Sequence, residues 1–209
     1  MQPGGGIAGS LPFAFMSDGY DPGSNEGIKV ETNLGPGNRG TISLPMEPSC
    51  SMGSGANDLR DAINYGACPA PVGSTVETET GNTWGPIKQA LDARIGDNTQ
   101  SFDDVFLFDA SLDRYVVRDV DSPRLGVVPV IENPDGTTTW PKGDKPVVIV
   151  GYLLVYIGRT DASPYPPYTA NKTVWVTPVR AVLPDELDAM FDDTFDPDND
   201  SPVTFRLVD

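Results

Sequence analysis

Carboxylates dominate the reactive side chains of this 209-residue sequence, which contains 30 acidic residues and no histidine. The lack of histidine excludes Ser-His-Asp and Cys-His catalysis, histidine general bases and histidine-containing zinc sites. Catalysis would therefore have to use carboxylates, lysine, tyrosine or a bound metal.

One acidic segment, Asp196-Pro197-Asp198-Asn199-Asp200, places oxygen ligands at alternate positions, as calcium-binding loops do at their first, third and fifth positions. The rest of the loop departs from that pattern. Ser201 stands where glycine is expected, and Leu207 stands where a bidentate glutamate is needed. We therefore favour a solvated acidic loop over a calcium site and expect no metal.

Two pairs of neighbouring acids, Asp103-Asp104 and Asp192-Asp193, are the simplest candidates for paired-carboxylate chemistry. Glycosidase acids must converge from separate segments across a cleft, and adjacent acids in a sequence do not show such convergence. A carboxylate-based hydrolase is the least favoured function, and we expect no catalytic residues.

Glycines 35, 37 and 40 match the dinucleotide-binding pattern G-x-G-x-x-G. That fingerprint must open a helix after a strand. Here the β-branched residues of Thr41–Leu44 follow, and Pro45 comes next. We interpret the match as a turn and expect no cofactor.

Cys50 and Cys68 are the only cysteines, with seventeen residues between them. Two cysteines alone do not complete a zinc site, and the spacing is not that of a C-x-x-C redox pair. We favour a structural disulfide, which persists in oxidising compartments. The alternative is a pair of unpaired thiols in a cytosolic protein.

Five aromatic residues raise the possibility of a stacking surface for sugars, as in a carbohydrate- or surface-binding adhesin. They are Trp84, Trp140, Trp175, Tyr165 and Tyr168. Packing in or near the core is the commoner role of such side chains. We keep the adhesin as the alternative function.

The formal net charge of −16, with 14 scattered basic residues, restricts the partners. Phosphate binding requires clustered lysine and arginine, so we expect no nucleic-acid partner. The longest apolar run, Val147–Ile157, is too short to cross a bilayer as a helix. No signal peptide is recognisable at the start, and we expect a fragment whose targeting segment lies upstream.

The 22 glycines and 21 prolines favour turns and short strands, and we predict a mainly β fold, a barrel or sandwich, with two or three short helices. Residues 1–27 should form an extended Gly/Pro-rich arm whose apolar patch, Leu11–Met16, docks on the body. Residues 28–209 should form a single domain with an acidic C-terminal segment. The expected helices are Ala56–Tyr65, Pro86–Ile95 and a short one over Asp185–Phe191. The expected strands are Ile28–Glu31, Thr41–Leu44, Val105–Phe108, Tyr115–Val120, Leu125–Ile131, Val147–Ile157, Thr173–Val182 and Val203–Val208.

Four ordered segments carry a family resemblance. The first is Gly37–Leu44, and the second is Gly55–Ile63 with Gly66 and Cys68 after it. The third is Val72–Asn82, running into Gly85-Pro86, Gln89-Ala90-Leu91 and Arg94; the fourth is Ser122–Val130 followed by Val148–Tyr152. This order resembles the C-terminal region of tight-adherence (Flp) pilus-assembly proteins of the TadG and TadE/G-like group.

The resemblance implies an exported, non-catalytic component of pilus assembly or surface attachment, anchored by a membrane helix upstream of this region. It implies a location at the cell surface or in a periplasm-like space. The expected partners are other pilus or secretion-system proteins, and this segment itself should not insert into a membrane.

Overall fold

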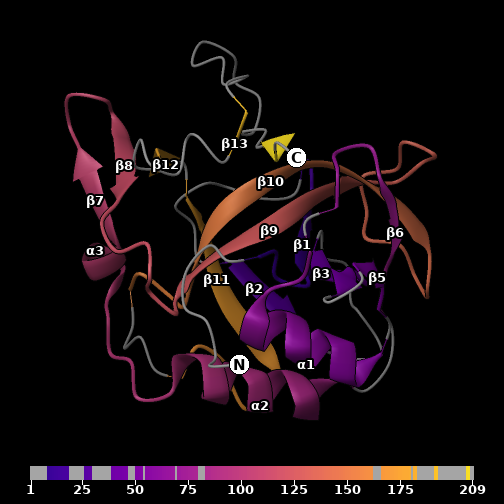
Figure 1. Ribbon diagram of the computed structural model, residues 1–209, viewed down its shortest axis with the longest axis horizontal. Helices are drawn as coiled ribbons and strands as arrows, with labels where there is room; N and C mark the ends of the chain where they lie inside the picture. Colours follow the sequence, from indigo (N-terminus) through magenta and orange to yellow (C-terminus); the bar gives the residue numbers. More distant parts are fainter. Residues whose placement is uncertain are drawn as a thin grey trace.

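The computed structural model describes residues 9–18, 26–29, 39–46, 50–53, 55–68, 70–79, 83–161, 166–179, 181–182, 191–192 and 206–207. Within these residues the chain is mainly β, as the sequence predicted, and has three helices, of which the short one at Phe102–Val105 was not expected (Figure 1). The calcium-like loop at 196–200, Tyr165, Asp193 and most of the helix expected at 185–191 lie outside them.

One seven-stranded sheet organises the chain. Its strands lie in the order β2 (Glu26–Lys29), β11 (Thr173–Val179), β10 (Pro146–Ile157), β9 (Leu125–Glu132), β1 (Phe13–Met16) and β3 (Arg39–Thr41), with β6 (Thr75–Glu77) paired to β10. All pairs are antiparallel except β1 with β9. The sheet is therefore mixed. Its strand order ends at β2 on one side and β3 on the other, so the sheet is open rather than the regular closed barrel considered from sequence. An isolated bridge between Ile42 and Thr78 does tie the end of β6 back to the β3 side.

Strand β1 is the main difference from the expected organisation. The apolar patch at Leu11–Met16 was expected in an arm docked on the body, but its last four residues form an interior strand. Phe15 lies opposite Val130 in β9 and Arg39 in β3. Both faces of β1 are buried, because alternate side chains of a strand point to opposite faces and both faces here are covered.

Two hydrophobic clusters fill the two faces of the sheet, as the nearly continuous apolar runs of β9 and β10 predicted. The cluster on one face contains Phe13, Phe15, Val128, Val130, Leu153, Val155, Val174 and Val176, packed with residues of both long helices. The cluster on the other face contains Ala14, Met16, Ile131, Ile149, Tyr152, Leu154, Tyr156 and Val179.

Helices α1 (Ala56–Tyr65) and α2 (Trp84–Ile95) cover the first face (Figure 1). The helix α1 has the predicted bounds, and α2 begins two residues before the expected Pro86. Each helix packs on the sheet with apolar side chains at the i, i+4 spacing of one helical face. They are Leu59 and Ile63 of α1, and Ile87 and Leu91 of α2. The φ angle of 81° at Gly66, just after α1, requires glycine.

A smaller sheet, in the order β12 (Ala181–Val182), β8 (Arg114–Val117) and β7 (Phe106–Asp109), projects from one side of the main sheet (Figure 1). The short helix α3 (Phe102–Val105) precedes it. Two further strand pairs are β4 (Pro45–Met46) with β5 (Ser51–Met52), and β13 (Phe191–Asp192) with β14 (Arg206–Leu207).

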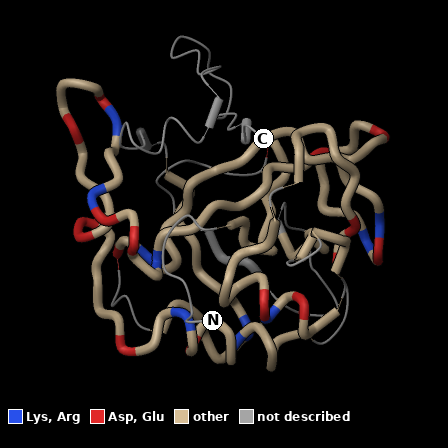
Figure 2. Tube along the Cα trace, viewed as in Figure 1, with Lys and Arg blue, Asp and Glu red and all other residues tan. Residues whose placement is uncertain are grey.

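Charged residues lie mainly on the helices, loops and projecting hairpin, whereas the central strands carry few (Figure 2). None of the helices in the described part of the chain has the length and hydropathy needed to cross a membrane.

Candidate functional site

The predicted cysteine pair forms a disulfide, with 5.6 Å between the Cα atoms of Cys50 and Cys68. It joins the β4–β5 turn to the segment that follows α1, and the backbone N–H of Cys68 also donates to Pro45 O at 2.8 Å. The closed loop contains α1. Because such a bond persists in oxidising compartments, it indicates an extracytoplasmic environment.

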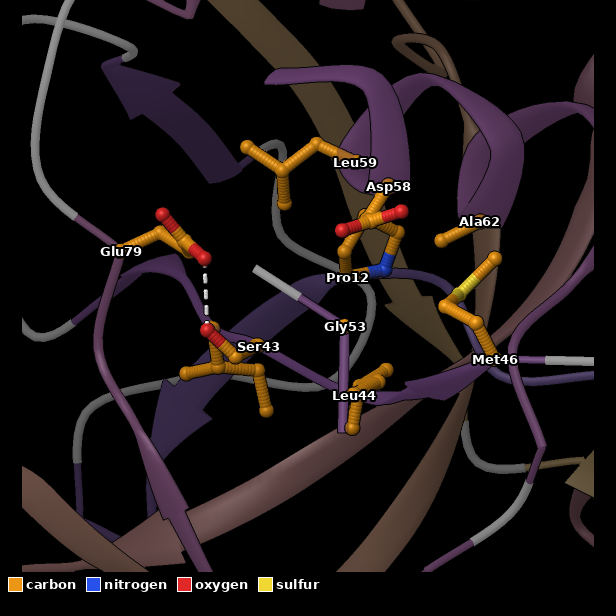
Figure 3. A pocket seen from close by; sticks show the side chains of 10 residues that line it. Pro12, Ser43, Leu44, Met46, Gly53, Asp58, Leu59, Ala62 and Glu79 are labelled. Atoms are coloured by element: carbon orange, nitrogen blue, oxygen red, sulfur yellow. Dashed lines mark hydrogen bonds between the residues drawn. The ribbon is translucent and has the colours of Figure 1, made fainter. Parts of the chain in front are cut away.

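A carboxylate joins three of the four segments that carry the family resemblance. Oε1 of Glu79 accepts hydrogen bonds from Ser43 Oγ at 2.6 Å and from the backbone N–H of Gly55 at 2.9 Å (Figure 3). Gly55 is the residue immediately before α1. The negative charge of Glu79 therefore lies where the helix dipole favours it, and it fixes the start of α1 against β3.

Asp58 and Glu79 both line a small hollow at this junction, between α1 and the β3–β4 segment (Figure 3). The volume open to the centre of a water-sized sphere is about 10 Å³. That is room for one water molecule at most, so the hollow is not a substrate site. Glu79 acts here as a structural group.

Two buried arginines fix α2 and β9 to their neighbours, and the first of them joins three of the resembling segments. The guanidinium of Arg94 on α2 donates to the carbonyl oxygens of Ile63 at 2.8 Å and of Pro123 and Leu125 at 2.9 Å. Burial lowers its pKa to about 10, because desolvation disfavours the charged form. The second arginine, Arg124, is fully buried and holds the Asn98 loop against the end of β10.

Two glycines of the resembling segments are required by close packing. A Cβ atom at Gly40 would lie 2.6 Å from two ring carbons of Trp140. A Cβ atom at Gly126, in β9, would overlap the side chain of Leu11. The residues of the resemblance therefore form one framework of buried bonds and close contacts rather than a cleft.

Of the five aromatic residues proposed as a sugar platform, the four that the structure describes do not meet on one surface. Trp84 and Tyr168 contact each other edge to face, 5.4 Å between ring centres, on the helix-covered side. Trp175 lies on the opposite side of β11, under the guanidinium of Arg159 at 4.8 Å. Trp140 is buried against Gly40.

Tyr168 is further restrained by a polar network on α2. Its hydroxyl donates to Asp92 Oδ1 at 2.6 Å, and Lys88 Nζ donates to Asp92 Oδ2 at 2.6 Å. Burial is the main cause of the raised pKa of Tyr168. Burial also acts to raise the pKa of Asp92, but the hydrogen bonds from Lys88 and Tyr168 outweigh it and lower that pKa. This network fixes the 166–173 segment against α2.

The acidic pair at Asp103-Asp104 serves helix α3. Oδ2 of Asp104 accepts from the backbone N–H and the hydroxyl of Ser101, in a capping box, and these bonds lower the pKa of Asp104. Among the residues that the structure describes, no group of histidine, cysteine or acidic side chains is arranged to hold a metal ion.

The feature best suited to contact another molecule is the hairpin formed by β7 and β8. Three large apolar side chains lie exposed within six positions: Leu107 at 56%, Phe108 at 49% and Leu112 at 51%. We call these three residues the hairpin patch. Exposed apolar side chains carried together on one projecting element are typical of interaction surfaces.

A row of aromatic rings fixes the hairpin to the core. Phe108 contacts Tyr115 at 5.3 Å, and Tyr115 contacts Phe102 at 5.1 Å between ring centres. Phe102 in turn packs on Phe106 and on the fully buried Tyr156. The patch is therefore held in a defined position by the main sheet.

The sequence predicted these two strands but not their exposure. The consecutive apolar residues Phe106, Leu107 and Phe108 look like a strand buried on both faces. Asp109 and Asp113, which follow the apolar residues, are the only signal that this strand ends in solvent. Hydrophobicity alone does not distinguish a strand buried on both faces from an exposed one.

Comparisons with protein-family models, with curated proteins and with solved structures find no match to this chain.

Proposed function

We propose that this chain is the exported, non-catalytic domain of a TadG-like component of tight-adherence pilus assembly or surface attachment, and that it acts through protein–protein contacts. The supporting observation is the bonding among the four resembling segments. Glu79 joins Ser43 and Gly55, and Arg94 joins Ile63 and Leu125. These bonds place the four segments in one packed unit, which we take as the exported domain.

Export agrees with the Cys50–Cys68 disulfide. We place the domain on the outer side of the membrane, anchored by a helix encoded upstream, with other pilus or secretion-system proteins as its partners. The hairpin patch provides an apolar surface for such contacts.

Deletion of the parent gene in its own host tests this function. Surface pili sheared from the cells and quantified by immunoblot of the major pilin should fall strongly and recover with the wild-type gene. Pilus levels unchanged by the deletion, or a parent gene that encodes no membrane helix before this domain, would contradict the proposal.

The carbohydrate-binding alternative has less support, because only Trp84 and Tyr168 contact each other among the four of these aromatic residues that the structure describes. A glycan array probed with the oxidised domain tests it directly. Saturable binding that is lost in Trp84→Ala, and retained in Trp140→Ala if that variant folds, would favour the adhesin.

A further inference from the structure

We propose that β7 is a docking edge for an extended apolar segment of a partner protein, flanked by lysine or arginine, which adds a strand to the β12-β8-β7 sheet. The proposal deepens the proposed function and rests on its protein–protein character. It does not depend on which pilus protein supplies the segment.

The first argument is the position of β7 at the end of its sheet. It pairs with β8 along Phe106–Asp109 in continuous register, and within the described residues no strand pairs with its other side. The backbone N–H and C=O groups on that side therefore have no strand partner among the described residues, and such edges accept a further strand. Although β7 is short, it contains no lysine, proline or bulge to block pairing.

The second argument is the distribution of apolar side chains on the strand. Leu107 and Phe108 are consecutive, so they point to opposite faces of the hairpin, and both are about half exposed. An added strand with apolar residues on both faces would cover both side chains. Leu112, in the turn that follows β7, adds a third exposed apolar side chain to the hairpin.

The third argument is preorganisation. The Tyr115 ring lies between Phe108 and the core residue Phe102, and the N–H of Arg118 donates to Val105 O at 2.8 Å at the base of the hairpin. Because this support already fixes the edge, a partner would lose little free energy in ordering it.

Charge identifies the partner's chemistry. The segment 102–119, which carries the hairpin, has five aspartates and two arginines; they are Asp103, Asp104, Asp109, Asp113, Asp119, Arg114 and Arg118. The whole chain has a net charge of −16. A second copy would bring two acidic rims together, whereas a segment with basic flanks would be attracted. Charge complementarity therefore favours a different, basic-flanked partner over self-association.

A fluorescent peptide of sequence Lys-Lys-Val-Thr-Val-Tyr-Val-Lys-Lys, titrated with the oxidised domain, tests the proposal. The same peptide with glutamate in place of lysine tests the role of charge. The variants are Leu107→Lys and Phe108→Lys, and the matched control is Met52→Lys, because Met52 is similarly exposed at 53% but lies in β5. Hydrogen exchange measured by mass spectrometry locates the bound peptide.

We expect saturable binding of the basic peptide, with slowed exchange at residues 106–109. Leu107→Lys and Phe108→Lys should each weaken binding about tenfold or more, and Met52→Lys should not. Binding should also be at least about tenfold weaker for the glutamate peptide.

Three outcomes would overturn the proposal: no binding of the basic peptide, equal binding by the Leu107→Lys variant and the wild-type protein, or equal binding of the two peptides. A wild-type dimer in light scattering that becomes monomeric in Leu107→Lys would assign the edge to a second copy instead. None of these results depends on pilus levels in the deletion strain, so the docking edge and the proposed function can fail separately.

Discussion

At the scale of one residue, Arg124 provides a test of how much a buried, hydrogen-bonded side chain contributes to the free energy of unfolding. Its guanidinium is fully buried and donates to the side chain and carbonyl of Asn98 and to Ile157 O, and burial lowers its pKa. Arg124→Met should leave these acceptors unpaired and reduce the free energy of unfolding by about 3 kcal/mol, measured by urea titration. Arg60→Met is the control, because the Arg60–Asp61 pair is on the surface, and its effect should be close to zero. Equal losses in the two variants would contradict this role for Arg124.

Tyr152 provides a prediction about pH. Its hydroxyl donates to Ala70 O, and burial raises its pKa to about 12. Between about pH 10 and about pH 12 the unfolded chain loses this proton while the folded chain keeps it, so stability should fall as pH rises. Tyr152→Phe should cost about 1 kcal/mol at about pH 8, through the lost hydrogen bond, and this difference should shrink or reverse at about pH 11.

Urea titrations at the two pH values measure the effect of Tyr152→Phe. The control is Tyr65→Phe, because Tyr65 lies exposed at the end of α1. A stability difference between wild type and Tyr152→Phe that stays constant over this pH range would show that the hydroxyl does not contribute to alkaline unfolding.

At the scale of elements, the disulfide closes a loop that contains α1. Its contribution to the free energy of unfolding can be measured without changing any residue of the helix. The paired substitution Cys50→Ser with Cys68→Ser should lower the free energy of unfolding by about 3 kcal/mol, the chain-entropy value for a loop of this length. Reductant should destabilise the oxidised wild type by a similar amount and leave the double variant unchanged. A reductant effect on the double variant would exclude the disulfide as its cause.

The elements with strong local patterns were predicted well. The helix at Ala56–Tyr65 and the strand ending at Ile157 have bounds that agree at both ends to within one residue. Their apolar spacing and the glycines that follow them mark their bounds. The connection between the antiparallel strands β9 and β10 runs from Asn133 to Lys145 and begins with a turn at Asn133–Gly136.

Elements that depend on distant contacts were not predicted. Strand β1 is parallel to β9, more than a hundred positions away, and the Gly- and Pro-rich segment around it suggested an arm. Strand β6 is three residues long and is held by β10, with no periodicity of its own. The candidate surface was missed for a related reason, because β7 is an edge only through the lack of a second neighbouring strand among the described residues, which its own sequence does not indicate.

At the scale of the whole molecule, the acidic charge accompanies a fold whose buried charged groups are arginines. Arg94 and Arg124 neutralise backbone carbonyl dipoles in the interior, while the aspartates and glutamates of the described chain lie at or near the surface. The ion pairs Arg60–Asp61, Lys88–Asp92 and Arg159–Asp161 are exposed. The chain has 30 acidic and 14 basic residues. Repulsion among the surface carboxylates therefore exceeds their attraction to the lysine and arginine side chains.

This imbalance predicts the response to salt. Raising NaCl from about 10 mM to about 500 mM at pH 7 should increase the free energy of unfolding by about 1 kcal/mol, because screening weakens repulsion in a chain of net charge −16. At about pH 4, where many carboxylates are protonated, the same change should have little effect. Urea titrations at both salt concentrations and both pH values measure this difference, with KCl replacing NaCl to exclude a specific sodium effect. A loss of stability with salt at pH 7 would instead show that the exposed ion pairs outweigh the repulsion among the acids.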